Sequence, residues 1–247
     1  MKIGTEWNEI KRFIGEKLIR FGHSLYPEDI YCTRADRVNF YDGILVVTAS
    51  GMQGSGKSHF THLLEEHFRK YGRKSAVVSL AGPLYKSISE LIGEPVDKEK
   101  TYEFGLVNPK SFTGRQLLQM EGTEFGRHNL HDQIWIGIAL KKAKEEHGLK
   151  EGDILLVDDV RFPNELCLLS DVAFYMLPPN EGDSAKKQKM HRSEFFQEFI
   201  RSNADFVLQW RPGQEVYICR KSPDGRRGLF GVDELAQLLI AVADAKL

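Results

Sequence analysis

The chain has 247 residues, of which 41% are hydrophobic and 28% are charged. This length and apolar share are enough for the core of one large domain and exclude a chain that is disordered throughout. The 34 basic residues nearly balance the 35 acidic ones, giving a net charge of -1. The protein therefore lacks the overall positive field that would attract a nucleic-acid polymer or an anionic membrane, and any bound anion must be held by a local cluster of cations.

Targeting and redox signals are sparse. No apolar run approaches the roughly 20 residues that span a bilayer, and the charged start lacks the apolar block of a secretory signal. We therefore expect a soluble protein of the cytoplasm, which is the host cytoplasm if the chain is viral. Cys32, Cys167 and Cys219 are widely separated and show no zinc-binding pattern, so reduced, buried thiols are expected.

Residues 1–42 are predicted to form a helical extension packed on the core. Its apolar residues recur at three- and four-residue spacings, which places them along one stripe of a helix. They are Trp7, Ile10, Phe13, Ile14, Leu18 and Phe21. Such a stripe usually packs on its own domain, and a contact with a second copy in a homodimer is the alternative.

Residues 43–247 alternate between strand-like and helix-like segments and are predicted to form one domain. The expected strands are "GILVVTAS", "SAVVSL", "DILLV", "VAFYML" and "DFVLQW". Helices are expected between them, including one near residues 84–92 and two over about 113–147, with a polar loop separating these. Such alternation predicts an α/β fold in which helices cover both faces of a parallel sheet. The segment "EVYICRKSPDGRRG" is expected to add a hairpin over about residues 213–229, before a last helix.

The segment "GMQGSGKS", residues 51–58, fits the pattern G-x-x-x-x-G-K-[ST] and lies between an expected strand and an expected helix. In this pattern backbone N–H groups and a helix N-terminus surround nucleotide phosphates. We expect Lys57 to reach the β and γ phosphates and Ser58 to bind Mg²⁺. A glycine-rich turn that matches by chance is the alternative, and the flanking segments disfavour it.

An acidic pair, Asp158 and Asp159, ends the expected strand "DILLVDDV". Strand C-termini line the ligand crevice of parallel sheets, so one aspartate is expected to serve Mg²⁺ directly or through water. The other caps the following turn. We favour Asp158 for the metal. Arg161 follows at once, and its guanidinium either binds a phosphate or neutralises the two aspartates.

Two more arginines lie in "TGRQLLQMEGTEFGR", residues 113–127. Thr113 and Gln116 form a capping-box pattern, so a helix is expected to begin at the threonine. Arg115 then lies in the first turn and Arg127 about three turns later. Both can touch one phosphate only if the helix breaks, which the two glycines of "EGTEFG" permit. A solvated surface position is the alternative for Arg127.

A lysine-rich segment, residues 180–192, is predicted to be a lid. Its cations are Lys186, Lys187, Lys189 and Arg192. Most charge runs are solvated surface. In a phosphotransferase, however, a basic segment can close over the transferred group and neutralise its charge. Ser193 is expected to cap the next helix.

An ordered set of segments behind the glycine-rich loop resembles the deoxynucleoside monophosphate kinases of tailed bacteriophages. The segments are "SLAGPLYKSI", "GRQLLQMEGTEFGR", "HDQIW", "VDDVRFPNE" and "HRSE", and with the loop they cover roughly residues 44–210. The resemblance implies a nucleoside monophosphate kinase fold with five parallel strands, an acceptor-binding region and a lid. It also implies transfer of the γ-phosphoryl group of ATP, with Mg²⁺, to a deoxynucleoside 5′-monophosphate.

The resemblance further implies roles for single residues. ATP would be held by Gly51, Gly54, Ser55, Gly56, Lys57 and Ser58. Lys57, Arg115, Arg127 and Arg161 would be catalytic, with the arginines gripping the acceptor or the transferred phosphate. The acceptor would be bordered by Ala81, Gly82, Pro83 and Lys86, and its nucleoside by Asp132 and Trp135. Phe104, Gln119, Phe125 and Trp135 are candidates for contact with the base, although the apolar ones are equally suited to the core. Ser58, Asp158 and Asp159 are the candidate metal ligands.

Three alternatives remain. A kinase acting on a hydroxyl, such as a deoxynucleoside kinase, would need a carboxylate base, for which Glu90 and Glu94 are candidates. Animal-type phosphomevalonate kinase shares a similar "GR…GTE" and acid–arginine pattern. A nucleotide-binding switch protein would use the loop to gate a partner, but it would not need the second cluster of arginines. Small-molecule nucleotides, rather than nucleic acid or membranes, are the expected partners.

Overall fold

The computed structural model describes residues 43–179, 196–211 and 215–246. The predicted N-terminal extension, Cys32, the predicted lid with its four cations, and Ser193 lie outside these residues. The division of the chain into an extension and one domain stays a prediction.

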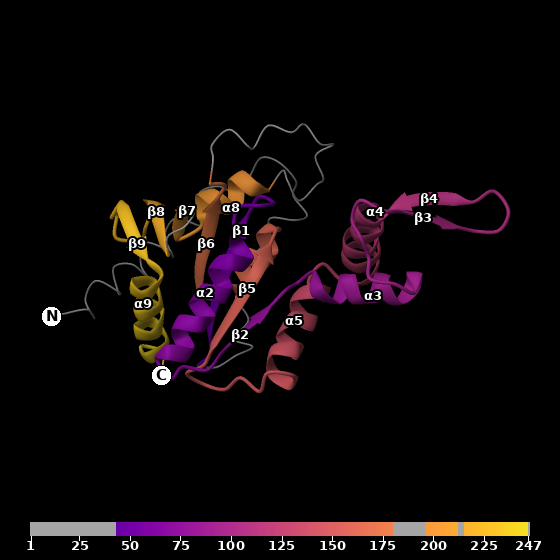
Figure 1. The fold of residues 1–247 in the computed structure, drawn as a ribbon. Helices are drawn as coiled ribbons and strands as arrows, with labels where there is room; N and C mark the ends of the chain where they lie inside the picture. The colour runs from indigo at the N-terminus through magenta and orange to yellow at the C-terminus, as the bar shows by residue number, and fades with distance from the viewer. Residues whose placement is uncertain (1–42, 180–195, 212–214, 247) are drawn as a thin grey trace.

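In the described part of the chain, a seven-stranded sheet has the order β2-β5-β1-β6-β7-β8-β9 (Figure 1). Its strands are β1 (Leu45–Gly51), β2 (Ser75–Val78), β5 (Ile154–Val160), β6 (Val172–Leu177), β7 (Phe206–Trp210), β8 (Val216–Lys221) and β9 (Gly228–Gly231). The first five run parallel, which confirms the predicted parallel core. β8 and β9 are antiparallel and extend the sheet beyond β7, within the segment where a hairpin was predicted.

Helices cover both faces of this sheet, as predicted. One face packs against α2 (Lys57–Lys70) and α9 (Val232–Asp244), and the other against α5 (Ile134–Glu145), α6 (Pro163–Leu169) and α8 (Gln197–Asn203). Strand β1 shows why its sequence is continuously apolar: Val47 points into the α2 and α9 core, whereas Val46 points into the opposite one. Both alternating faces of a central parallel strand are buried. This sheet therefore positions the loops at the carboxyl ends of β1 and β5 side by side.

An arm extends from one side of the sheet (Figure 1). It contains α3 (Gly82–Ile92), β3 (Thr101–Phe104), β4 (Lys110–Thr113) and α4 (Gly114–Gln119), and has a small core of Ile88, Tyr102 and Leu117. The prediction of a polar loop between residues 92 and 113 was wrong, because β3 and β4 pair there as a hairpin. Each strand has only four residues, and charged side chains alternate with the aromatic ones that pack inward, which hides the apolar pattern.

The helix that begins after Thr113 does not break. Its capping box is confirmed: Gln116 N donates to Thr113 Oγ1 at 3.2 Å, and Thr113 N donates to Gln116 Oε1 at 2.8 Å. α4 then continues directly as a π-helix, η2 (Met120–Leu130), so the predicted break was wrong. The glycines serve packing instead, because a Cβ on Gly126 would lie 2.4 Å from the Trp135 ring. π-Helical segments are rare and frequently mark functional sites.

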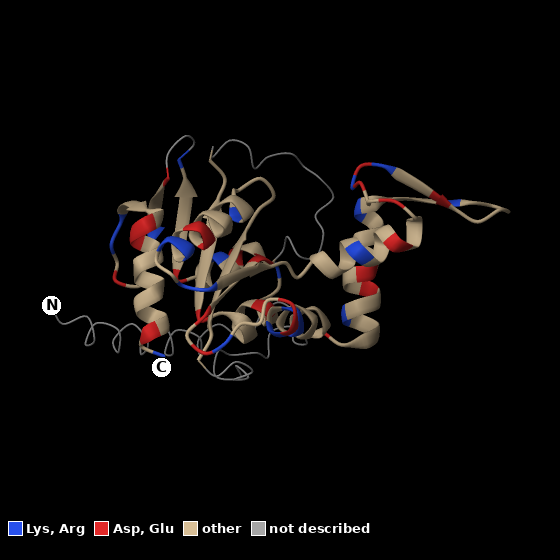
Figure 2. Cartoon of the chain, turned by 60° about the horizontal axis from the view of Figure 1, so that its bottom comes forward, with Lys and Arg blue, Asp and Glu red and all other residues tan. Residues whose placement is uncertain are grey.

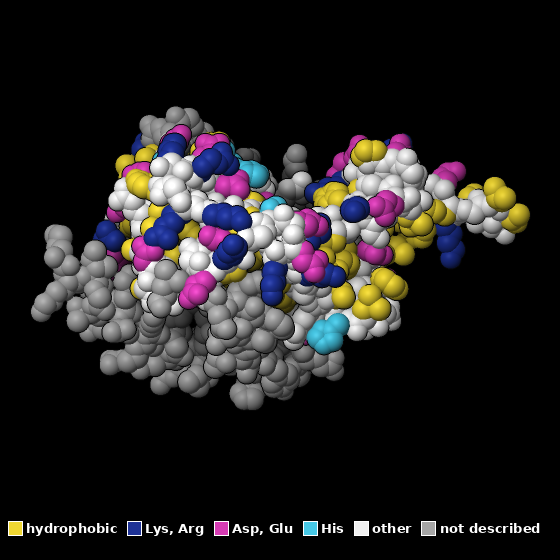
Figure 3. Space-filling model, turned by 90° about the horizontal axis from the view of Figure 1, so that it is seen from below, with side chains coloured by type: hydrophobic (Ala, Val, Ile, Leu, Met, Phe, Trp, Pro, Cys, Tyr) yellow, Lys and Arg dark blue, Asp and Glu magenta, His cyan; other side chains and the backbone are white. Residues whose placement is uncertain are grey.

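The surface has interspersed charges of both signs, in keeping with the near-zero net charge (Figure 2). Apolar side chains gather toward the far end of the arm (Figure 3), where Leu106 and Val107 are exposed in the turn between β3 and β4. Within the described ranges, no helix has the length and apolar character needed to cross a bilayer. Cys167 and Cys219 are buried free thiols, as predicted.

Candidate active site

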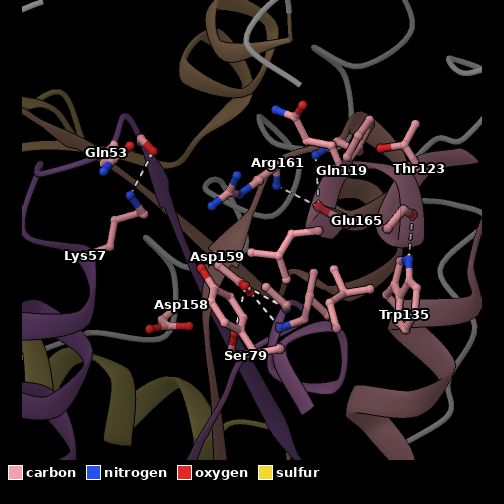
Figure 4. Close-up of a pocket in the computed structure, with 18 of the residues that line it drawn as sticks. Gln53, Lys57, Ser79, Gln119, Thr123, Trp135, Asp158, Asp159, Arg161 and Glu165 are labelled. Carbon is pink, nitrogen blue, oxygen red and sulfur yellow. Dashed lines mark hydrogen bonds between the residues drawn. The ribbon is translucent and has the colours of Figure 1, made fainter. Parts of the chain in front are cut away.

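A cavity of about 380 Å³ lies where the ends of β1 and β5 face the arm (Figure 4). Its volume falls in the range of about 300–1,000 Å³ that small-molecule sites occupy. The predicted site residues that line it are Gly51, Gly54, Lys57, Ser58, Ala81, Arg115, Gln119, Arg127, Trp135, Asp158, Asp159 and Arg161. One cavity thus joins residues from both predicted phosphate-binding regions.

Other predicted site residues are not part of the lining. They are Ser55, Gly56, Gly82, Pro83, Lys86 and Asp132. Ser55 is buried, and its N–H donates to Met52 O at 3.2 Å. Lys86 is exposed on α3. Asp132 acts through its backbone, because its carbonyl accepts hydrogen bonds from Arg127 and Asn164.

The glycine-rich loop turns from β1 into α2 around Lys57. Gly51 is required at the turn, since a Cβ there would lie 2.3 Å from Met176 O and the residue has a φ of +136°. The Lys57 ammonium donates to Gly51 O at 2.9 Å and to Met52 O at 2.8 Å. Burial, and then the neighbouring charge of Arg161, lower the pKa of Lys57 to about 8. A buried ammonium that only carbonyls contact favours an incoming anion.

Asp158 and Ser58 form the set of oxygens expected for a divalent cation. Ser58 Oγ donates to Asp158 Oδ2 at 2.8 Å. The other carboxylate oxygen, Oδ1, is buried and has no hydrogen-bond partner among the described residues. Burial first, and then the charge of Asp159, raise the pKa of Asp158. An orphaned carboxylate oxygen beside a hydroxyl fits Mg²⁺, which prefers oxygen ligands and keeps several waters.

Asp159 is engaged by protein donors. Its carboxylate accepts hydrogen bonds from Ser79 Oγ at 2.8 Å, Leu80 N at 2.7 Å and Ala81 N at 2.8 Å. Asp159 therefore fixes the connection between β2 and α3, where the arm begins. This geometry favours Asp158 as the metal ligand and a structural role for Asp159.

Arg127 is held by three groups at the back of the cavity. Its guanidinium is ion-paired with Glu165, donates to Asp132 O at 3.0 Å, and lies 4.0 Å from the centroid of the Phe162 ring. The second Glu165 oxygen accepts from the backbone N of Arg161 at 2.6 Å and of Phe162 at 2.9 Å. Glu165 is thus a buried member of the site that the sequence reading missed. The available signal was a glutamate two residues after the proline that opens α6, a helix-capping pattern.

The remaining arginines differ in their partners. Arg115 Nη2 donates to Glu99 Oε1 at 2.6 Å. Arg161 is exposed, and its guanidinium forms no ion pair with the residues that the structure describes. Lys98 and Tyr85 also line the cavity, although no motif singled them out.

The candidates for base contact separate into two groups. Gln119 and Thr123, one α4 and one η2 residue, line the cavity (Figure 4), and their side chains have no hydrogen-bond partner within the described ranges. Trp135 is buried, and its Nε1 donates to Gly122 O at 2.8 Å. Phe104 packs on Phe112 in the hairpin and Phe125 is exposed, and neither lines the cavity. Thr123 was not predicted.

The chain was compared with known proteins. No protein-family model matches it. A segment of 57 residues is 39% identical to the deoxynucleoside-5′-monophosphate kinase of Escherichia phage T5 and covers 23% of this chain. The chain spans about a fifth (21%) of the length of that curated relative. Among solved structures, shikimate kinase from Acinetobacter baumannii in complex with shikimate matches 83% of this chain and 97% of its own, with a TM-score of 0.37 and 13% sequence identity.

Proposed function

We propose that this protein transfers the γ-phosphoryl group of Mg-ATP to the phosphate of a deoxynucleoside 5′-monophosphate, giving the diphosphate and ADP. The observation that carries the proposal is the single cavity that joins the glycine-rich loop to a second group of cations on the arm and on η2. The local similarity to a phage deoxynucleoside-5′-monophosphate kinase supports the choice of acceptor.

The donor side would be formed by the loop and the end of β5. Lys57 and the N–H groups at the start of α2 would hold the β and γ phosphates. Ser58 and Asp158 would hold Mg²⁺, which neutralises charge on these phosphates when bound. Lys57 would exchange its carbonyl contacts with Gly51 and Met52 for phosphate oxygens.

The acceptor side requires no strong base. A phosphate monoester is already anionic at neutral pH, so one of its oxygens can attack the γ-phosphorus directly while the bond from that phosphorus to the β–γ bridging oxygen breaks. The carboxylates that line the cavity suit this chemistry. Asp159 and Glu165 are saturated with donors, and Asp158 is paired with Ser58. Arg161, which has no competing carboxylate partner in the described chain, would neutralise the charge that is transferred.

A kinase that acts on a hydroxyl is less well supported. Neither candidate base, Glu90 or Glu94, lines the cavity, and Glu94 is ion-paired with Lys100. Phosphomevalonate kinase and a nucleotide-binding switch are separated from the proposed function by experiment.

The deciding test incubates the purified protein with Mg-ATP and a panel of deoxynucleoside and ribonucleoside monophosphates, deoxynucleosides and phosphomevalonate, and identifies the products by mass spectrometry. We expect deoxynucleoside diphosphates and ADP in equal amounts, and no product with the Lys57→Ala variant. Phosphorylated phosphomevalonate or deoxynucleoside alone would replace the proposed acceptor. ADP and free phosphate without any phosphorylated acceptor would support a switch protein.

A further inference from the structure

Lys98 occupies a position in the cavity wall that the motifs do not account for. It lies between α3 and β3 on the arm, is partly buried, and lines the cavity together with Tyr85 and Arg115. Its Nζ is 5.3 Å from the centroid of the Tyr85 ring, and its carbonyl accepts a hydrogen bond from Arg115 N at 3.0 Å. The backbone therefore holds Lys98 and Arg115 together, and the ring supports the lysine side chain beside the cavity.

The cations of the cavity differ in whether a carboxylate already neutralises them. Arg115 is ion-paired with Glu99, and Arg127 is ion-paired with Glu165. Lys98 forms no ion pair with any residue that the structure describes, although its near neighbour Lys100 is paired with Glu94. Lys98 therefore supplies uncompensated positive charge on the arm side of the cavity.

The charge of Lys98 also acts across the cavity. The pKa of Lys57 is lowered first by burial and then by Arg161, and Lys98 contributes in the same direction. Two unpaired cations on opposite walls repel each other until an anion lies between them. Binding a polyanion would relieve this repulsion, so the arrangement favours phosphate at the junction of loop and arm.

We propose that Lys98 binds the phosphate of the acceptor nucleotide and provides the arm's largest electrostatic attraction for it. This inference rests on the proposed function and assigns the acceptor phosphate to a residue of the arm. Lys98 can bind that phosphate without breaking an existing ion pair, whereas Arg115 must first share or release Glu99.

Three variants test the assignment. Lys98→Met keeps a long apolar stem and removes the charge, Lys98→Arg keeps the charge, and Lys100→Met is the matched control on the same segment. Steady-state rates are measured with the acceptor varied at saturating Mg-ATP, and then with Mg-ATP varied. We expect Lys98→Met to raise the acceptor KM by about 10- to 100-fold, the effect of losing a charged hydrogen bond. The ATP KM should change by less than about twofold, Lys98→Arg should restore most of the affinity, and Lys100→Met should behave as wild type.

An unchanged acceptor KM in Lys98→Met, with active wild-type protein, would overturn the assignment and leave the proposed function standing. If the wild type phosphorylates no monophosphate, the proposed function fails, and the anion site is judged by calorimetric binding of inorganic phosphate in the presence of Mg-ADP. Weaker binding in Lys98→Met than in Lys100→Met would then support an anion site at Lys98. Equal binding in the two variants, or none in the wild type, would remove it. Thermal unfolding of each variant checks that the differences do not come from misfolding.

Discussion

The guanidinium of Arg127 is ion-paired with the carboxylate of Glu165 in an almost dry environment, with the two side chains 10% and 2% exposed. Two ions removed from water depend on each other, because either one alone would be a buried, uncompensated charge. Glu165 also accepts hydrogen bonds from two backbone N–H groups at the start of α6. This glutamate thus connects the position of Arg127 to the end of β5, where the metal-binding aspartate is expected.

We expect Glu165→Ala to lower the free energy of unfolding by about 3–5 kcal/mol, because it leaves the Arg127 charge buried without a partner. Glu90→Ala, at an exposed position of α3, is the control and should change stability by less than about 0.5 kcal/mol. Urea unfolding followed by circular dichroism measures both. A loss below about 1 kcal/mol for Glu165→Ala would mean that water reaches Arg127 and that the pair is not structurally important.

The acidic pair at the end of β5 should separate by function. Asp158 has a raised pKa and an unpartnered oxygen, so Asp158→Asn relieves a buried charge and should leave the melting temperature unchanged or higher. Phosphoryl transfer should nevertheless fall by at least about 100-fold, because the carboxylate ligand for Mg²⁺ is lost. Asp159→Asn removes the acceptor of three hydrogen bonds and should lower the melting temperature instead. Thermal melts and Mg²⁺ titrations of activity distinguish the variants, and the opposite pattern would exchange the two roles.

Binding of Mg-ADP should weaken above about pH 8. The pKa of Lys57 is lowered from 10.5 to about 8, so the free protein loses this charge as the pH rises through that value. Phosphate binds the protonated lysine, and its presence raises the pKa, so binding takes up a proton near pH 8 and becomes less favourable as the pH increases further. Isothermal titration calorimetry between pH 7 and 9 in buffers of different ionisation enthalpy measures both effects. Lys57→Arg keeps its charge throughout this range and should abolish the proton uptake; its persistence would assign the titration to another group.

The parts of the fold that could be predicted from the sequence are those with a local physical signature. The apolar run around Val46 and Val47, the glycine-rich loop and the Thr113 capping box each determine their own conformation over a few residues. The π-helical turn has no such signature. It depends on how Trp135 packs against Gly126, and neither residue reveals this contact from its neighbours in the chain.

The same limit explains the charges of the site. Arg127 reads as a solvated helix residue because its partner, Glu165, lies 38 positions further along the chain. Lys98 reads as one of several charges in a polar segment, and only the folded hairpin shows that Lys98 faces the cavity while Lys100 pairs with Glu94. Residue types that suit phosphate can be read from the sequence, but which cations remain unpaired depends on tertiary contacts.

Two glycines near the π-helix should respond oppositely to alanine. A Cβ at Gly126 would lie 2.4 Å from the Trp135 ring, so Gly126→Ala must displace the indole that supports the cavity floor, and we expect a loss of about 1–3 kcal/mol in the free energy of unfolding. Gly137, within α5, has nothing within 4 Å of its added Cβ, and Gly137→Ala should stabilise the protein by up to about 1 kcal/mol through helix propensity. Chemical unfolding measures the pair, and near-ultraviolet circular dichroism reports the environment of Trp135. Equal effects of the two substitutions would show that the indole does not depend on the close approach at Gly126, and that the π-helical turn has some other origin.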